Sequence, residues 1–348
     1  MSETARSSLL IVRLGSLGDL VHTLPAVAAL RAGFLNAGRS QDRPRLDWVV
    51  EEKWCPLVQM VPVVDRVIPL RRSLAGTLEC VRELRRNRYA CTVDFQGLYK
   101  SALLAWCSGA PRRIGFDHAI AREPGAARFY TEHAGPRGRH VTDLNAGLAI
   151  CAGAGAPVPV RFPLCVPDEE MQKWEEKISV SGARTGYIVV SPGGGWKSKC
   201  WPVERYGELC REIWQRHGVQ AVVNAGPGEE ELAAAVTRAS EPATPLSFSP
   251  SLPELCAILA KARTVIAADT GPLHLAAALG TRVVALFGPT DPLRNGPVYE
   301  CSGRGTILRN VSQDANTYKR GADYSPAMLS LTVEQVIAAV EREMGIAP

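Results

Sequence analysis

Long apolar segments are missing from this sequence of 348 residues. Before Arg13 there is only the short apolar run Leu9–Val12, far shorter than the core of a signal peptide or the roughly 20 residues of a membrane span. The longer stretch 144–160 is interrupted by Asn145 and by several glycines and prolines, which is typical of a helix that runs into a linker. We therefore expect a cytoplasmic protein that does not span the membrane.

Cysteine and histidine patterns typical of metal sites are also absent. The ten cysteines contain no C-x-x-C pair and lie mostly in apolar segments, which is typical of buried, reduced thiols rather than disulfides or zinc ligands. The six histidines show no H-x-x-x-H spacing. We therefore predict no metal site and no bound cofactor.

Acidic residues are scarce in the first half of the chain. Residues 1–166 carry 22 Lys and Arg against 14 Asp and Glu, a net charge of +8, whereas residues 167–348 carry 18 against 21, a net charge of −3. A basic half indicates an anionic partner, which could be nucleic acid, a membrane surface or a phosphorylated acceptor. The run from Arg82 to Arg88 is better explained as a solvated helix face. Nucleic acid is disfavoured because interleaved aromatic residues and module signatures are missing.

Apolar runs alternate with amphipathic segments along the whole chain. In the first half, strands are predicted at 9–14, 45–50, 66–70 and 90–95, and helices at 20–30, 74–86 and 100–107. The Gly, Ala and Pro-rich segment 152–167 is predicted to be a linker. In the second half, strands are predicted at 187–191, 219–224, 264–268 and 283–287, and helices at 203–217, 229–240, 272–279 and 333–344. Thr332 and Gln335 form a capping box for the last helix.

This alternation predicts an α/β protein with two doubly wound, Rossmann-like domains, residues 1–166 and 167–348. The carboxyl ends of their strands, and therefore their ligands, are expected at a shared central cleft. The C-terminal helix is expected either in the second domain or packed back on the first.

The most informative segment is Ala267–His274, where an apolar strand ends at Asp269 and a helix begins near Pro272. Proline suits the first helical turn, because its missing N–H is no loss there. Backbone N–H groups and the helix dipole then favour an anion such as a diphosphate. Thr270 adds a hydroxyl donor, and Gly271 allows a phosphate to approach the backbone. The alternative is an ordinary capped helix.

Two further loops of the second half follow strands. The glycine turn Gly193–Gly195 precedes Lys197 and Lys199. Glycine turns expose backbone donors and lysine supplies a point charge to phosphate oxygens, although either lysine alone could simply be solvated. The next loop ends in Glu229–Glu231. A carboxylate there either accepts hydrogen bonds from ribose hydroxyls or only stabilises the first turn of its helix.

In the first half, the segment Arg13–His22 places an acid, Asp19, at the start of the first helix. Gly15 and Gly18 do not form the G-x-G-x-x-G pattern of dinucleotide-binding proteins, so a dehydrogenase loses its main support. An acid on a glycine loop facing a nucleotide-sugar site is what an inverting transferase needs, because the acceptor hydroxyl must lose its proton. The alternative is that Asp19 only caps its helix.

Several segments together resemble glycosyltransferase family 9, the ADP-heptose:lipopolysaccharide heptosyltransferases. They are Ile11–Ala26, Phe95–Ala102, Ala121–Pro124 with Phe129–Tyr130, Lys199–Pro202, Asp269–His274 and Leu286–Pro292. The segments 96–100 and 122–124 are most similar to the members that add the first core heptose. The resemblance implies a GT-B fold with an N-terminal acceptor domain and a C-terminal ADP-heptose domain. It also implies inversion at the anomeric carbon without a metal at the diphosphate.

The resemblance, together with the loops described above, implies a role for each candidate residue. Asp19 is the implied catalytic base. The implied donor residues are Gly194, Gly195, Lys199, Glu229, Glu230, Asp269, Thr270, Gly271, Pro272, Leu273 and His274. The implied acceptor residues are Gly18, His22, Arg71, Arg72, Gln96, Lys100 and Arg122. The acceptor would be Kdo2-lipid A or a related anionic glycolipid, and the protein would be peripheral on the inner face of the cytoplasmic membrane.

Two positions depart from the family pattern. Gly194 and Gly195 stand where the members that add the first heptose have adjacent hydroxyl residues, so backbone donors must replace side chains. Gly228 stands where an acid is expected near the ribose, and only Glu229 or Glu230 could substitute. We favour inverting heptose transfer to a Kdo hydroxyl. The alternatives are a family relative that modifies the second core heptose or a protein hydroxyl, and a non-catalytic nucleotide-sugar-binding protein, against which Asp19 argues.

Overall fold

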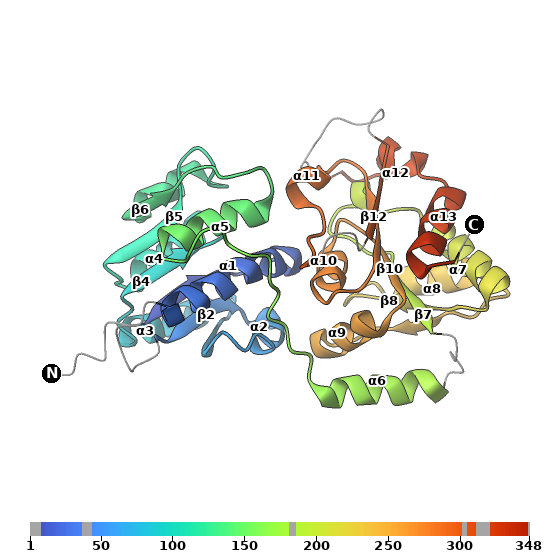
Figure 1. Cartoon of the computed structure of the whole chain (residues 1–348), viewed down its shortest axis with the longest axis horizontal. Coiled ribbons are helices and arrows are strands. Elements are labelled where there is room, and N and C mark those ends of the chain that lie inside the picture. Colours follow the sequence, from blue (N-terminus) through green and yellow to red (C-terminus); the bar gives the residue numbers. More distant parts are fainter. Residues whose placement is uncertain (1–7, 37–43, 181–185, 301–304, 311–320, 347–348) are drawn as a thin grey trace. The chain divides into compact units, whose positions relative to one another are not determined.

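The structure, a computed structural model, describes residues 8–36, 44–180, 186–300, 305–310 and 321–346. The chain divides into two units, Met1–Cys165 and Val166–Pro348, which we call the first and second domains. Figure 1 shows the first domain in blue to green and the second in green to red. Residues 152–167, where a linker is predicted, contain no helix or strand.

A six-stranded parallel sheet forms the centre of the first domain, in the order β3-β2-β1-β4-β5-β6. Its strands are β1 (Leu9–Val12), β2 (Leu46–Glu51), β3 (Arg66–Leu70), β4 (Cys91–Asp94), β5 (Arg112–Phe116) and β6 (Glu132–Ala134). Every residue of β1, β2 and β4 is buried, as expected for central parallel strands covered on both faces.

The helices of the first domain follow their strands closely. They are α1 (Leu17–Asn36), α2 (Cys55–Gln59), α3 (Leu74–Arg86), α4 (Tyr99–Cys107) and α5 (Val141–Cys151), with 3₁₀ turns η2 (Glu52–Trp54) and η3 (Pro124–Phe129). Helix α3 begins where Ser73 accepts a hydrogen bond from the Gly76 N–H, a standard N-cap that satisfies one orphan donor. Helices α1 and α5 pack side by side, as Figure 1 shows, and α3 contacts α4.

The second domain repeats this architecture around its own six-stranded parallel sheet, in the order β12-β11-β10-β7-β8-β9. The strands are β7 (Tyr187–Ser191), β8 (Gln220–Asn224), β9 (Leu246–Phe248), β10 (Thr264–Ala268), β11 (Val283–Phe287) and β12 (Gly305–Arg309). If β7 is counted as its first strand, this order matches that of the first sheet. The predicted fold class, two doubly wound α/β domains, is confirmed.

The helices of the second domain are α6 (Asp168–Val180), α7 (Val203–His217), α8 (Glu230–Ala239), α9 (Leu252–Lys261), α10 (Gly271–Ala278), α11 (Pro292–Asn295), α12 (Pro326–Ser330) and α13 (Val333–Met344), with the 3₁₀ turn η4 (Lys197–Lys199). Helix α13 packs against α7, β10, β11 and β12, and its apolar face joins the core of the second domain. This packing agrees with the expectation that the helix belongs to the second domain. Within the described residues, no helix is both long and apolar enough to cross a bilayer.

Candidate active site

In each sheet the strand order reverses between two central neighbours, β1 and β4 in the first and β7 and β10 in the second. Ligands of doubly wound proteins bind outside the carboxyl ends of such strands, because the loops diverge there and leave a crevice. The segments that follow β1 and β4 carry Asp19 and Gln96, and those that follow β7 and β10 carry Lys199 and Asp269. The candidate residues thus lie at the switch point of each domain.

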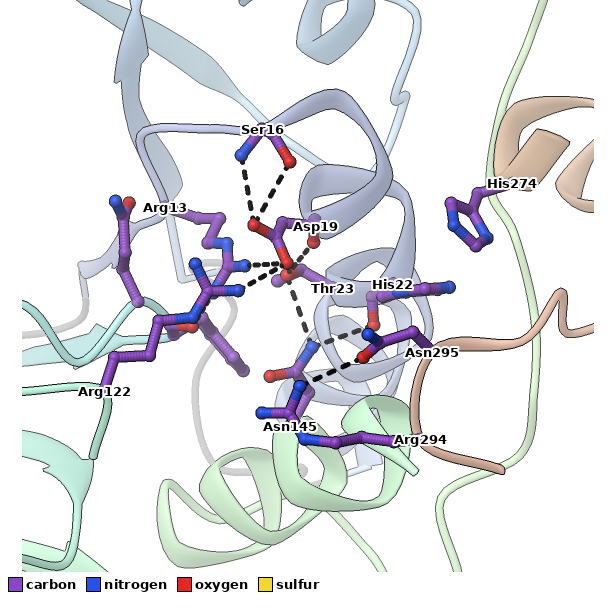
Figure 2. Close-up of polar contacts among 12 residues, drawn as sticks. Arg13, Ser16, Asp19, His22, Thr23, Arg122, Asn145, His274, Arg294 and Asn295 are labelled. Carbon is purple, nitrogen blue, oxygen red and sulfur yellow. Dashed lines mark hydrogen bonds and ion pairs between the residues drawn. The ribbon is translucent and has the colours of Figure 1, made fainter. Parts of the chain in front are cut away.

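Asp19 lies in the first turn of α1 and is held by four polar groups. Its Oδ1 pairs with Arg13 Nη2 at 2.7 Å and with Arg122 Nη2 at 2.8 Å. Its Oδ2 accepts hydrogen bonds from the backbone N–H and the hydroxyl of Ser16, both at 3.2 Å. Figure 2 shows the two guanidinium groups and Ser16 around the carboxylate. Asp19 therefore both caps its helix and carries a fixed, charged carboxylate.

The two arginines set the protonation state of Asp19. Burial alone would raise the pKa of the carboxyl group, but the charges of Arg13 and Arg122 outweigh it and lower the pKa to about 2. They differ in exposure, since the Arg13 side chain is 2% exposed and that of Arg122 is 44% exposed. Arg13 also donates to the carbonyl oxygen of Phe95. Arg13 is therefore a built-in counterion, whereas Arg122 is accessible to a ligand.

The loop after β4 helps to hold the segment that carries Asp19 in place. Gln96 is buried, and its Oε1 accepts a hydrogen bond from the Leu14 N–H at 2.7 Å, so it braces the loop that leads to Asp19. Gly97 has φ +68°, and a Cβ there would lie 3.1 Å from the Phe116 ring and 3.4 Å from the backbone nitrogen of Arg122. Only glycine fits this left-handed position comfortably, and the close approach brings the Arg122 segment to Asp19.

His22 and Gly18, both expected on the acceptor side, are buried in α1. The His22 ring packs edge-on against His140 with the ring centroids 5.3 Å apart. The Asn145 amide on α5 donates to the His22 carbonyl oxygen at 2.9 Å, which ties α5 to the turn that follows Asp19 (Figure 2). Gly18, His22 and Gln96 are all buried, and they support the segment that carries the Asp19 carboxylate.

The remaining basic residues expected on the acceptor side are engaged by acids that the sequence did not single out. Glu51, at the end of β2, pairs with Arg72 at 2.8 Å and with Lys100 at 3.3 Å. Burial would raise the pKa of Glu51, but these two cations lower it. Arg71 pairs with Glu52 at 2.8 Å. All three cations are more than half exposed, so an anionic ligand can reach them but must displace a carboxylate.

In the second domain, Lys199, Asp269 and His274 form a largely buried triad. Lys199 Nζ lies 2.7 Å from Asp269 Oδ2, and His274 Nε2 lies 3.1 Å from Asp269 Oδ1. Burial would raise the pKa of Asp269, but His274 and Lys199 together hold it well below its usual range. The ammonium of Lys199 also sits 4.4 Å from the centroid of the Trp196 ring. Lys199 and His274, which lies in the first turn of α10, therefore share the carboxylate of Asp269.

The glycine loop after β7 lies against the start of α10. A Cβ on Gly194 would lie 3.0 Å from Cys200 Sγ and 3.5 Å from Thr270 Cγ2. Thr270 is the N-cap residue of α10, but its side chain accepts no capping hydrogen bond, and its hydroxyl donates to the Ala268 carbonyl oxygen at 3.1 Å. Gly271, Pro272 and Leu273 form the first turn. Backbone donors, helix dipole and lysine therefore meet in one place, as an anion site requires.

The two glutamates considered for the ribose differ in their surroundings. The Glu229 carboxylate accepts a hydrogen bond from the Gly226 N–H at 2.9 Å and occupies the space beside Gly193, where a Cβ would lie 2.1 Å from it. Glu230 is exposed and accepts a hydrogen bond from the Gly228 N–H at 3.2 Å. Glu229 thus lies next to the Gly193–Gly195 loop, whereas the hydrogen bond of Glu230 is made within the turn before α8.

Two residues near the site, Arg13 and Glu51, were not singled out from the sequence. Arg13 was visible as a charged residue at the end of an apolar strand, which is an unusual place for an unpaired cation. Glu51 likewise ends a buried strand. Among the described residues, no group of three or more His, Cys, Asp or Glu side chains is placed to hold a metal ion.

Comparison with known proteins points to one family. The family model described as glycosyltransferase family 9 (heptosyltransferase) matches residues 77–325. Lipopolysaccharide heptosyltransferase 1 of Pseudomonas aeruginosa is 32% identical over 81% of this chain and 79% of its own length. Lipopolysaccharide heptosyltransferase 3 of Escherichia coli K12 is 25% identical over 79% of this chain and 80% of its own length.

Solved structures agree with the sequence relatives. The Escherichia coli heptosyltransferase WaaC with ADP superposes with a TM-score of 0.73 and 26% identity, covering 97% of this chain and 99% of its own. The Escherichia coli ADP-heptose lps heptosyltransferase II is only 20% identical but has a TM-score of 0.78 over 97% of this chain and 98% of its own. The two-domain architecture is therefore that of solved heptosyltransferases.

Proposed function

This chain belongs to glycosyltransferase family 9 and has the GT-B fold of that family, and we propose that it transfers L-glycero-D-manno-heptose from ADP-heptose to a Kdo residue of the lipopolysaccharide inner core. Family membership makes it a glycosyltransferase of the heptosyltransferase type. The donor, the acceptor and the roles of individual residues are the content of the proposal. The observation that carries it is the placement of Asp19 and of Lys199 with Asp269 at the switch points of the two domains.

The second domain is the proposed donor site. The diphosphate of ADP-heptose would bind the Gly193–Gly195 loop and the start of α10, with Lys199 as its charge partner. Lys199 is 15% exposed and already paired with Asp269, so a phosphate that draws the ammonium away leaves an ionised carboxylate. That carboxylate, still bonded to His274, can then accept hydrogen bonds from sugar hydroxyls. Solved relatives with ADP and with ADP-2-deoxy-2-fluoro heptose support this donor.

The first domain is the proposed acceptor site, with Asp19 as the base. An acid whose pKa is about 2 is ionised at neutral pH but is a weak base while both arginines hold it. The Kdo carboxylate of the acceptor can take over the exposed Arg122, which leaves Asp19 with Arg13 alone. The loss of one positive neighbour raises the pKa of Asp19 and makes it a stronger base. Acceptor binding would thus activate the base.

The chemical step then follows directly. The acceptor hydroxyl attacks the anomeric carbon of the heptose on the face opposite ADP and gives its proton to Asp19. The bond between the anomeric carbon and the phosphate oxygen breaks, and ADP leaves with an additional negative charge. Lys199 and the N-terminus of α10 stabilise that charge as it develops, which lowers the barrier more than it tightens ground-state binding. Attack from the opposite face inverts the anomeric configuration.

The choice of a Kdo acceptor rests on the relatives. Lipopolysaccharide heptosyltransferase 1 is 32% identical to this chain, against 25% for lipopolysaccharide heptosyltransferase 3 and 26% for lipopolysaccharide heptosyltransferase 2 of Escherichia coli K12. The basic cluster of Arg71, Arg72 and Lys100 also suits an acceptor that carries carboxylates and phosphates.

Mass spectrometry of the reaction with ADP-heptose tests the proposal. Kdo2-lipid A is compared with the same acceptor that already carries one heptose, and ADP-glucose serves as the control donor. We expect the mass of one heptose to be added to Kdo2-lipid A only. Addition only to the heptosylated acceptor would assign the second transfer instead, and ADP binding without any transfer would indicate a non-catalytic protein.

A further inference from the structure

Exposed apolar side chains are concentrated on two neighbouring helices of the first domain. The described residues include ten exposed large hydrophobic side chains, and five of them lie on α3 and α4. These five are Leu74 (88% exposed), Leu78 (55%), Tyr99 (45%), Leu103 (46%) and Trp106 (51%), and we call them the α3–α4 surface. The other five are scattered, each on a different element of the second domain.

Helical spacing places these side chains on the outer face of each helix. Leu74 and Leu78 are four residues apart, and Tyr99, Leu103 and Trp106 follow at intervals of four and three, which defines one stripe per helix. The opposite faces, with Gly76 and Cys80 on α3 and Ser101 and Ala105 on α4, are buried.

The two stripes lie on helices that contact each other. Helix α3 contacts α4, and the Arg85 Nε donates to the Cys107 carbonyl oxygen at 3.2 Å where both helices end. A contiguous exposed apolar patch on a soluble domain usually marks a surface that meets a partner or a membrane.

Several arginines lie beside the α3–α4 surface, and the acid next to Leu78, Glu79, is paired with Arg71. Arg82, one turn after Leu78, and Arg85 have no carboxylate within ion-pair distance in the described part of the chain, whereas Glu83 on the same helix pairs with Arg66. Arg128 lies over the Tyr99 ring, 5.6 Å from its centroid. Tryptophan, tyrosine and leucine within a rim of arginines match the interfacial zone of an anionic bilayer, because the rings prefer the headgroup depth and the cations attract anionic lipids.

The position of this surface also fits a membrane. Helices α3 and α4 both begin at the carboxyl edge of the sheet, so Leu74 and Tyr99 adjoin Arg72 and Lys100, which belong to the basic cluster proposed to bind the acceptor. A glycolipid acceptor keeps its acyl chains in the bilayer while its sugars enter the enzyme. The surface next to the acceptor site must therefore face the lipid.

We propose that the α3–α4 surface docks on an anionic membrane, with Leu78, Leu103 and Trp106 entering the headgroup region. The proposal rests on the proposed function in one respect, since it takes the acceptor to be lipid-anchored. It adds the surface, the side chains and the lipid charge. Binding should weaken at high salt, because the arginine rim contributes through screened Coulomb attraction.

Co-sedimentation of the full chain with vesicles of phosphatidylethanolamine and phosphatidylglycerol tests this directly. The test variant is Leu78→Ser with Leu103→Ser and Trp106→Ser. The matched control is Trp214→Ser with Ile307→Ser and Leu329→Ser, which removes similarly exposed apolar side chains from the second domain. We expect the test variant to bind vesicles at least about tenfold more weakly, since membrane affinity scales with buried apolar area. The control variant, and a conservative variant with Leu78→Met, Leu103→Met and Trp106→Phe, should bind like the wild type.

Activity separates this proposal from the proposed function. With a deacylated, water-soluble Kdo acceptor the test variant should match the wild type, which also shows that it is folded. With the acylated acceptor in vesicles it should lose most of its activity. Vesicle binding unchanged in the test variant, or absent in the wild type, would overturn the proposal. The proposal would also be overturned if analytical ultracentrifugation showed that the wild type is a dimer and the test variant a monomer. If no Kdo acceptor is used but vesicle binding still depends on these side chains, the proposed acceptor fails and the membrane surface stands.

Discussion

Replacing Arg122 with glutamine is expected to raise the acceptor KM while kcat falls by less than about threefold. The structure provides the reason, because Asp19 keeps a second cation when Arg122 is removed. Arg13 lies 2.7 Å from the same carboxylate oxygen and is almost completely buried. The carboxylate therefore remains anchored and charged, and what the enzyme loses is the exposed guanidinium that we propose binds the acceptor carboxylate.

The size of each effect follows from the geometry. A unit charge about 4 Å away contributes about 4 kcal/mol at an effective dielectric constant of about 20, or about three pKa units. This is an upper bound, because the Arg122 side chain is 44% exposed and screened by water. Even then the pKa of Asp19 rises from about 2 to no more than about 5, which leaves the base ionised at neutral pH. Loss of one charge-assisted contact to the acceptor costs about 1.5 kcal/mol, or about tenfold in KM.

Steady-state kinetics with the deacylated Kdo acceptor at saturating ADP-heptose measure the changes in acceptor KM and in kcat separately. Arg128→Gln is the matched control, since that exposed arginine contacts Tyr99 rather than Asp19. The reasoning is wrong if Arg122→Gln lowers kcat as strongly as a substitution of Asp19 and leaves the acceptor KM unchanged. Arg122 would then act only by orienting the base.

Three further predictions use the same site. Asp19→Asn should lower kcat by about 10²- to 10⁴-fold with ADP affinity unchanged in calorimetry, and near-wild-type turnover would remove Asp19 from the mechanism. Lys199→Ala should weaken ADP binding by about 1.5–3 kcal/mol, more than Lys197→Ala, and equal losses in the two variants would refute the assignment. Because the pKa of Asp19 is lowered to about 2 from an unfolded value of 3.8, its contribution to stability is present above that unfolded value and lost as pH falls through about 2. Denaturant unfolding should show Asp19→Asn about 2 kcal/mol less stable than wild type at pH 7, with a difference that shrinks steadily toward pH 2.

Elements with a strong apolar period could be predicted from the sequence. Strands β3, β7, β10 and β11 and helices α3, α7 and α13 have the predicted bounds. Strands β7, β10 and β11 are buried throughout, and the three helices each bury one apolar face. Helix α6 was missed because Trp174 is its one buried side chain, so it has almost no period to detect. Helix α9 was missed although Ser251 and Glu254 form a capping box, a signal that the sequence did contain.

Positions of the site residues were predictable for a different reason. In a doubly wound sheet the segments after the central strands all begin at the carboxyl edge of the sheet, so Asp19, Lys199 and Asp269 could be placed near the switch points once the strands were assigned. The partners that are distant in sequence could not be predicted. Arg122 lies 103 residues from Asp19, and Lys199 lies 70 residues from Asp269. No local pattern encodes which charge meets which.

The basic first domain shows why net charge alone is a poor guide to a binding site. Its charge of +8 indicates an anionic partner, but Arg71, Arg72, Lys100 and Arg122 each already face a carboxylate. An anionic acceptor must therefore replace existing ion pairs rather than occupy free cations. Its affinity is the difference between the energy of its own ion pairs with these cations and the energy of the ion pairs that it displaces. In the proposed mechanism the same exchange releases Asp19 from Arg122. The compensated charges would then couple recognition of the acceptor to activation of the base, which a cluster of unpaired cations could not do.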